Sequence, residues 1–242
     1  MDKFFLALDY RYEQEAIERG MSALFFLRQS FGRLVEGKLG VKVNGDLLTA
    51  SVDSKLREFP DHGYDVFADL KLAHDPAMGE DVVRRVTGRN YTNLSVKYVT
   101  IFAGLGPAML GDYARRLGGI NLVAYTAHTK MDEKEALQAY NASDMDELML
   151  RFGTSAHTAG FDSMVIDGER LKNKSIRDLP VKKLVTGVRL RTEERGDQSR
   201  MTLLGDLAKM KEHVDYVVVS SRYLSKPRDK PRELEAYFAE LL

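Results

Sequence analysis

Short apolar runs rich in β-branched residues recur along the whole chain and alternate with longer stretches of helical spacing. Eight such runs are present, at residues 4–8, 40–43, 64–70, 96–102, 121–126, 161–166, 183–188 and 214–219. Strands that are apolar on both faces and alternate with amphipathic helices form a parallel sheet covered by helices. We therefore expect one domain over residues 1–242, a single (β/α)8 TIM barrel of eight parallel strands with outer helices.

The stretches between these runs predict the outer helices. Apolar residues recur at helical spacing, with charged residues on the opposite face, over residues 13–31, 76–87, 107–117, 132–152, 201–212 and 232–242. The sixth unit is the weakest, because residues 167–179 are short, polar and only doubtfully helical. No Pro/Gly-rich linker divides the chain, so a second domain is not expected.

Charge and cysteine content exclude several classes of function. The chain of 242 residues has 36 basic and 36 acidic side chains, so no overall field attracts nucleic acid or an anionic membrane. Cysteine is absent, which excludes disulfides, thiolate metal sites and a cysteine nucleophile. The apolar run after Met1 is too short for a signal peptide or a membrane span, and we expect a cytoplasmic protein.

Charged residues gather where the predicted strands end, which is the catalytic face of such a barrel. Asp69 and Lys71 are two residues apart and share one face of a regular strand, while Lys42 lies on the neighbouring strand. Asp75 follows as a candidate fourth member. Alternating charges of this kind keep one another ionised, and a lysine among them can deliver a proton to a carbanion.

Simpler interpretations of the same residues remain open at this point. An Asp-x-Lys pair is often only a surface salt bridge, and Asp75 before Pro76 has the pattern of a helix N-cap. Asp9 can simply end the first strand. The segment over residues 189–200 contains four arginines and is either a lid or anion clamp or a solvated loop. The histidines and carboxylates form no convincing metal cluster.

Together these segments resemble the orotidine 5′-monophosphate decarboxylase family, in the correct order over nearly the full chain. The similar segments are LALD ending at Asp9, GVKV around Lys42, FADLKLAHDP at 67–76, GPAML at 106–110, AGFDSMV at 159–165, and LVTGVR followed by GDQ at 196–198. The segment at 67–76, with Asp69 and Lys71, is the most specific of them.

The resemblance implies a carboxy-lyase that converts orotidine 5′-monophosphate to UMP without a cofactor or metal, in the last step of pyrimidine biosynthesis. It also implies a homodimer with shared active sites, in which Asp75 of the partner subunit completes each charge network. Lys71 would protonate C6, Asp69 would press on the departing carboxylate, and Lys42 would hold Asp69 and the ribose. The implied substrate-binding residues are Asp9 for the ribose, Thr129 for the base, and Gln198 and Arg222 for the phosphate.

The chain departs from the family pattern at the edge of this site. His74 stands where the family has its second signature aspartate, and Asp75 follows one residue later; Arg222 is displaced by one residue in the same way. Two alternatives therefore stay open. One is a Mg²⁺-dependent sister enzyme of the 3-hexulose-6-phosphate synthase or 3-keto-6-phosphogluconate decarboxylase type, and the other is a non-catalytic barrel that binds a nucleotide or phosphate.

Overall fold

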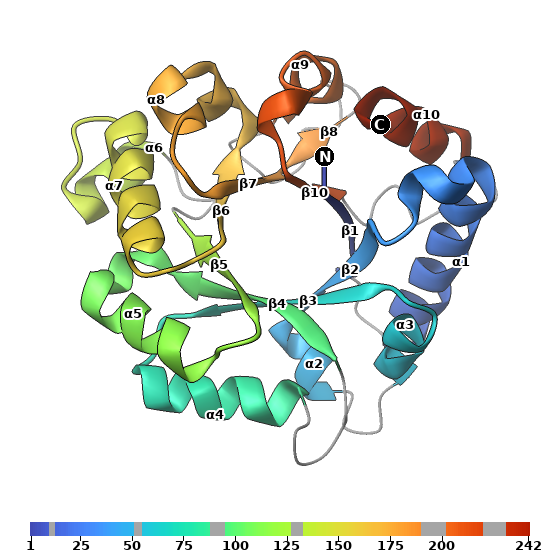
Figure 1. Ribbon diagram of the computed structural model, residues 1–242, viewed down its shortest axis with the longest axis horizontal. Coiled ribbons are helices and arrows are strands. Elements are labelled where there is room, and N and C mark those ends of the chain that lie inside the picture. Colours follow the sequence, from blue (N-terminus) through green and yellow to red (C-terminus); the bar gives the residue numbers. More distant parts are fainter. Residues whose placement is uncertain (10–12, 51–54, 88–94, 127–132, 190–201, 220–230) are drawn as a thin grey trace.

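The computed structural model describes residues 1–9, 13–50, 55–87, 95–126, 133–189, 202–219 and 231–242. Eight parallel strands close into a barrel in the order β1-β10-β7-β6-β5-β4-β3-β2 (Figure 1). They are β1 (Lys3–Ala7), β2 (Leu39–Asn44), β3 (Asp65–Leu72), β4 (Val96–Phe102), β5 (Asn121–Tyr125), β6 (Ser163–Asp167), β7 (Lys182–Thr186) and β10 (Tyr216–Val219). The expected (β/α)8 barrel is confirmed, and all eight predicted strands are present.

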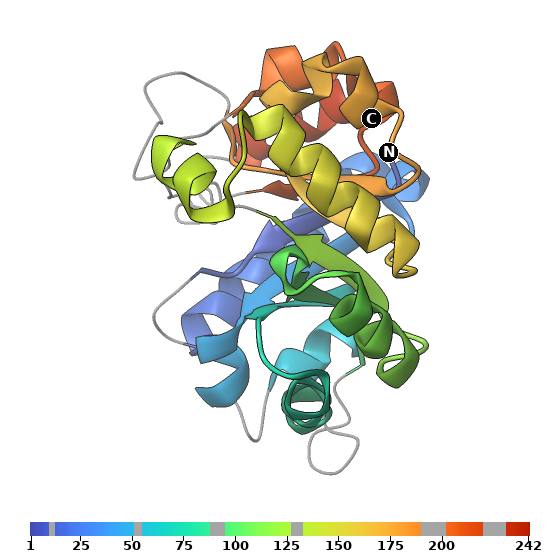
Figure 2. The same ribbon diagram turned by 90° about the vertical axis from the view of Figure 1, so that its left-hand side faces the viewer.

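The helices surround the barrel on its outside (Figures 1 and 2). The longer helices are α1 (Glu13–Phe31), α4 (Pro76–Thr87), α5 (Pro107–Arg116), α6 (Glu133–Tyr140), α7 (Met145–Thr158) and α10 (Pro231–Leu241). The shorter ones are α2 (Gly45–Ala50), α3 (Glu58–Asp61), α8 (Lys174–Arg177) and α9 (Leu204–Ala208). Among the described residues, no helix is long and apolar enough to cross a membrane.

The structure corrects one predicted helix. Residues 132–152 were expected to form a single helix, but α6 ends at Tyr140 and α7 begins at Met145. Asn141 has a positive φ of 48°, and the side chain of Asp144 accepts a hydrogen bond from the backbone N–H of Glu147 at 2.8 Å. A left-handed residue followed by an N-cap ends one helix and starts the next, although the apolar spacing continues through both.

Two smaller differences concern the units after β6 and β7. The doubtful region at 167–179 forms a 3-10 segment over Gly168–Lys172 and the one-turn helix α8. The helix expected at 201–212 is only α9, preceded by β9 (Thr202–Leu203), which pairs with β8 (Val188–Arg189). Residues 190–200 of the arginine-rich segment lie outside the described residues.

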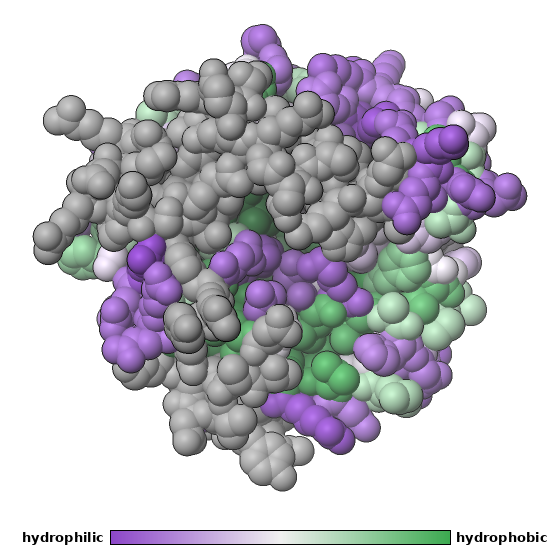
Figure 3. Space-filling model, turned by 180° about the vertical axis from the view of Figure 1, so that it is seen from behind, coloured by the Kyte–Doolittle hydropathy of each residue, from purple (hydrophilic) through white to green (hydrophobic). Residues whose placement is uncertain are grey.

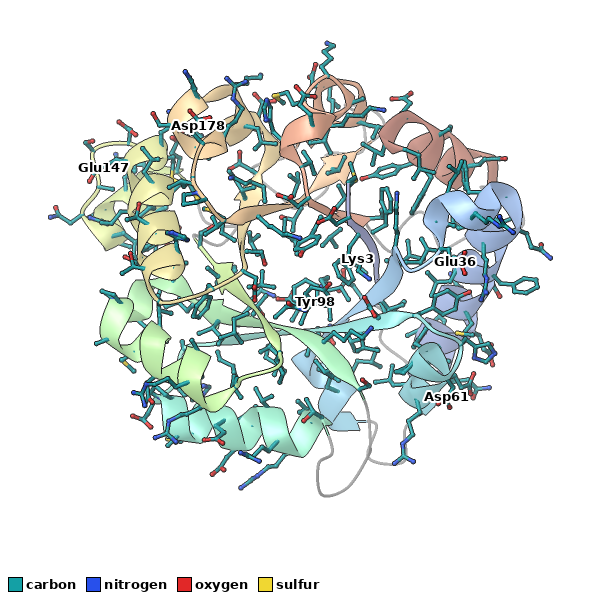
Figure 4. All side chains as sticks on the ribbon, viewed as in Figure 1. Lys3, Glu36, Asp61, Tyr98, Glu147 and Asp178 are labelled. Carbon is teal, nitrogen blue, oxygen red and sulfur yellow. The ribbon has the colours of Figure 1, made fainter. Side chains whose placement is uncertain are left out.

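Apolar side chains fill both faces of the barrel strands. Inside the barrel lie buried residues from seven strands, namely Phe5, Ala7, Phe67, Tyr98, Val123, Val165, Leu184, Tyr216 and Val218. A larger apolar layer lies between the strands and the helices. Figure 4 shows Tyr98 and Lys3 within the ring of strands, whereas Glu36, Asp61, Glu147 and Asp178 lie on the outer rim. This packed interior holds the residues at the carboxyl ends of the strands in fixed positions.

Candidate active site

Strand register brings three charged residues together at the carboxyl ends of β1, β2 and β3. Lys42 is in register with Ala7 and with Phe67, which both belong to the apolar cluster inside the barrel. Neighbouring residues in register point to the same side of a sheet, so Lys42 also points inward. Its Nζ lies 3.1 Å from Oδ1 of Asp9 and 3.3 Å from Oδ2 of Asp69.

Asp69 is the centre of this cluster. Its Oδ2 lies 2.6 Å from Nζ of Lys71 as well as 3.3 Å from Nζ of Lys42. Its Oδ1 accepts a hydrogen bond of 3.0 Å from the Thr100 hydroxyl. Only 12% of the Asp69 side chain is exposed, so nearby groups rather than water satisfy both carboxylate oxygens.

The surrounding charges keep Asp69 and Lys42 ionised. Burial alone would raise the pKa of the Asp69 carboxyl, but Lys42 and Lys71 outweigh burial and hold that pKa below its usual value. Burial would likewise lower the pKa of Lys42, but the charges of Asp69 and Asp9 outweigh it and raise that pKa. The cluster is therefore a stable array of a carboxylate between two ammonium groups.

Lys71 reaches Asp69 through a β-bulge rather than through regular strand alternation. Ala68 pairs with Val99 and Leu72 with Ile101, so β3 has three residues where β4 has only Thr100. Lys71 has a φ of 48°, and its backbone N–H donates to the Thr100 hydroxyl at 2.8 Å. A side chain in this left-handed region costs about 1–3 kcal/mol and is most often found at functional sites.

Two neighbours of this array were not anticipated from the sequence. Thr100 bonds both Asp69 and Lys71, and Tyr125, at the end of β5, has its ring centroid 5.6 Å from Nζ of Lys71. The available signal for Thr100 was a small hydroxyl side chain near the carboxyl end of β4. For Tyr125 the signal was an aromatic residue at the end of a short strand. In the structure its ring lies 6.2 Å from the ring of Phe102, measured between centroids.

Asp75 lies apart from this group within the chain. Its side chain is exposed and accepts a hydrogen bond of 2.9 Å from the backbone N–H of Ala77, with buried Pro76 at the start of α4. That contact is an N-cap, as the simpler interpretation expected. Among the residues that the structure describes, the ion pairs of Lys42 and Lys71 are with Asp9 and Asp69.

Three of the four predicted substrate-binding residues, Thr129, Gln198 and Arg222, lie outside the described residues. Asp9 is described, and 47% of its side chain is exposed beside Lys42.

Within the described segments, no group of three or more His, Cys, Asp or Glu residues could hold a metal ion. On the face seen in Figure 3, hydrophilic residues gather near the centre beside a hydrophobic area.

The arrangement can donate a proton next to a fixed negative charge. Lys71 is the more exposed of the two ammonium groups around Asp69, with 38% of its side chain accessible, whereas the figure for Lys42 is 12%. A ligand above the barrel would thus meet the Lys71 ammonium and the Asp69 carboxylate together. A closed barrel with such groups at its strand ends defines the class of (β/α)8 enzymes with a charged acid–base site.

Comparison with known proteins places the chain within a particular family of that class. Residues 2–237 match the family described as orotidine 5′-phosphate decarboxylase / HUMPS, and the chain belongs to this family. Orotidine 5′-phosphate decarboxylase of Actinobacillus pleuropneumoniae is 31% identical over 211 residues, covering 83% of each chain. The protein of the same name from Idiomarina loihiensis is 27% identical over 248 residues, covering 100% of this chain and 97% of its own.

Solved structures support the same fold. A Lactobacillus acidophilus orotidine 5′-phosphate decarboxylase superposes with a TM-score of 0.71 at 19% identity, covering 100% of this chain and 99% of its own. That from Pyrococcus horikoshii gives 0.68 at 23% identity, with 98% of each chain covered. These likenesses concern the fold, whereas the match over residues 2–237 confirms the family membership expected from the sequence motifs.

Proposed function

We propose that this protein is a carboxy-lyase that converts orotidine 5′-monophosphate to UMP, the last step of pyrimidine biosynthesis, without a cofactor. The observation that carries the proposal is the Lys42–Asp69–Lys71 array, in which one carboxylate with only 12% of its side chain exposed is bonded by two ammonium groups. The relatives' shared name, orotidine 5′-phosphate decarboxylase, supports the same substrate. The proposed compartment is the cytoplasm.

The chemistry follows from the charges. The bond between C6 and the carboxylate breaks, carbon dioxide leaves, and the electron pair remains on C6. The negative charge of Asp69 repels the carboxylate of the substrate, and this repulsion is relieved when the carboxylate leaves as carbon dioxide. Lys71 stabilises the charge that develops on C6 and then transfers its Nζ proton to that carbon. Lys42 holds Asp69 ionised and in place.

Substrate binding is assigned to groups around this centre. Asp9, next to Lys42, binds the ribose. Thr129 contacts the base, and Gln198 and Arg222 bind the phosphate. Energy from the phosphate contacts, remote from C6, orients the ring against Lys71 rather than adding only to affinity.

The assay follows the absorbance of orotidine 5′-monophosphate and the appearance of UMP with purified protein, with and without EDTA. Turnover that is insensitive to EDTA supports the proposal. We expect Lys71→Ala to lose at least about a hundredfold in kcat, because a positioned proton donor contributes about that much. Turnover by Lys71→Ala within a few-fold of wild type would rule Lys71 out as the donor.

The same assay separates the two alternatives. A Mg²⁺-dependent sister enzyme would act on a sugar phosphate and lose that activity with EDTA, and a binding protein would bind UMP without turnover. The geometry disfavours the first, because Asp69 would have to ligate the metal while its Oδ2 lies within 3.3 Å of two ammonium groups.

We also propose that the protein is a homodimer in which Asp75 of the partner subunit completes each active site. The exposed side chain of Asp75, just before α4, and exposed Met78 in the first turn of α4 support a role outside its own chain. Inactive Lys71→Ala and Asp75→Asn proteins, mixed and allowed to exchange subunits, should regain about a quarter of wild-type activity, because half of the dimers are mixed and each has one intact site.

The matched control mixes Lys71→Ala with the double variant Lys71→Ala/Asp75→Asn, in which no intact site can form. Activity in the first mixture alone supports sharing of Asp75. Equal activities in both mixtures would mean that Asp75 is not shared between subunits and acts only as the N-cap of α4.

A further inference from the structure

A buried tyrosine on α5 contacts the segment that carries Asp75. Tyr113 has no exposed surface, and its hydroxyl donates a hydrogen bond of 3.1 Å to the backbone carbonyl of His74, the residue before Asp75. Burial and, second, the negative charge of Asp75 raise the pKa of Tyr113 to about 12. The hydroxyl therefore keeps its proton, and with it the bond, at any physiological pH.

The same hydroxyl fits against the first turn of α4. A Cβ placed on Gly79 would lie 2.0 Å from the Tyr113 hydroxyl oxygen, closer than any real contact. Gly79 also donates its backbone N–H to the carbonyl of Asp75 at 2.9 Å. Glycine thus lets Tyr113 approach the backbone of the turn that begins at Asp75.

Charged side chains hold the two helices together close to this contact. Glu80, next to Gly79, accepts hydrogen bonds from Arg84 of its own helix and from Arg116 of α5, the latter at 3.0 Å. Arg116 also donates to Asp112 on its own helix at 3.1 Å. These contacts hold the start of α4 in a fixed position against α5.

We propose that Tyr113 is a positioning residue for the proposed reaction, holding the His74–Asp75 segment so that the Asp75 carboxylate reaches its place in the active site. The inference deepens the proposed function and rests on it, because Tyr113 acts through Asp75. The displacement of Asp75 by one residue from the family pattern favours such a support: His74 stands in the place of the family's aspartate, and a fixed point at His74 sets where the carboxylate of the next residue lies.

The test is a double-mutant cycle of Tyr113→Phe and Asp75→Asn, read as kcat and KM separately. Phenylalanine keeps the ring that fills the space beside Gly79 and removes only the hydroxyl. Loss of one hydrogen bond to the loop should lower kcat about two- to tenfold with KM within about twofold. In the Asp75→Asn background the same change should have no further effect on kcat, because there is no carboxylate left to position.

Tyr98→Phe is the matched control, since it removes the hydroxyl of another buried tyrosine, which lies on β4 in the apolar cluster inside the barrel. Its kcat should equal that of wild type. Gly79→Ala is a second variant, for use if Tyr113→Phe is recovered only as unfolded protein. It keeps the Tyr113 hydroxyl but displaces it, so it should lower kcat in the same way.

Three results would overturn the inference. The first is a wild-type kcat for Tyr113→Phe, and the second is an equal loss with and without the Asp75 carboxylate. The third is a wild-type kcat for Asp75→Asn, which removes the role of Asp75 and that of Tyr113 together. Failure of the proposed function would be seen in a different measurement, because the Lys71→Ala protein would then retain turnover.

Discussion

Two ammonium groups share one oxygen of a single carboxylate at the centre of the site. Lys42 and Lys71 both contact Oδ2 of Asp69, and the hydroxyl of Thr100 occupies Oδ1. A carboxylate bonded on both oxygens has little freedom to rotate. The Lys71 ammonium is thereby held at a fixed place beside a negative charge before any substrate arrives, which is the condition for electrostatic catalysis.

The ionisation of Asp69 makes stability depend on pH in a definite direction. Its pKa is lower in the folded protein than the usual 3.8, so its ion pairs stabilise the fold above pH 3.8 and are lost as the pH falls through the folded value. Asp69→Asn should reduce the free energy of unfolding by about 2–4 kcal/mol at neutral pH, because two ammonium groups lose their partner.

Urea unfolding of both proteins at several pH values measures this effect. The gap between wild type and Asp69→Asn should narrow as the pH falls below 3.8 towards the lower pKa of the folded protein, because Asp69 then becomes protonated. A gap that stays constant to the lowest pH would contradict the lowered pKa.

The ring of Tyr125 should contribute to the position of the Lys71 ammonium, which lies 5.6 Å from its centroid. Tyr125→Leu removes the aromatic face, and we expect kcat to fall about two- to fivefold, as loss of a cation–π contact of about 0.5–1 kcal/mol predicts. Tyr125→Phe keeps the face and is the matched control, so its kcat should stay closer to that of wild type. Steady-state kinetics of the two variants test this; equal losses in both would assign the effect to the hydroxyl instead.

The sequence could indicate part of the site but not all of it. Lys42 and Asp69 follow from strand spacing, because side chains at strand ends converge whichever loops follow them, whereas Lys71 follows from the motif. Thr100 and Tyr125 depend on how β4 and β5 are aligned with β3. The bulge at Lys71 shifts that alignment, and no local pattern in the sequence records it.

At the scale of elements, apolar periodicity identified the strands well and the helix ends less well. The helices α1 and α4 have the predicted bounds, because each has one continuous apolar face. The pair α6 and α7 was predicted as one helix, since the spacing continues across a break made by Asn141 and Asp144. The short helices α2 and α3 were not predicted, because helices of six and four residues are too short to show a period.

The break between α6 and α7 gives a test at this scale. The backbone N–H of Ser143 donates to the carboxylate of Glu147, and the backbone N–H of Glu147 donates to the carboxylate of Asp144, the N-cap of α7. Asp144→Ala should lower the free energy of unfolding by about 1 kcal/mol without changing kcat. Thermal and urea unfolding check the value, and Thr154→Ala, at an exposed position within α7, is the control. Equal stabilities of the two variants would mean that the cap does not hold the break.

For the whole molecule, the repetition of eight units predicted closure of the sheet, and the structure shows how the ends are joined. Strand β1 pairs with β10 and with β2, so the first and last strands complete the ring. Near the amino ends of the strands, Asp65 is buried and bonded by Lys3 of β1 and by Lys97 of β4, the latter at 2.5 Å. These residues come from separate strands around the ring, so their meeting depended on the closed fold.

This second charge cluster should serve stability rather than chemistry, because it lies at the opposite end of the barrel from Lys71. Asp65→Asn leaves two ammonium groups without their shared carboxylate, and we expect the free energy of unfolding to fall by about 1–3 kcal/mol with kcat unchanged. Asp2→Asn is the matched control: its ion pair with Lys182, at 2.6 Å, joins side chains that are 51% and 46% exposed, so its loss should cost under about 1 kcal/mol. Urea unfolding and kcat, measured on the same preparations, separate the two ends of the barrel. If Asp65→Asn lowered kcat while leaving stability intact, the division between a stabilising amino end and a reactive carboxyl end would be wrong for this barrel.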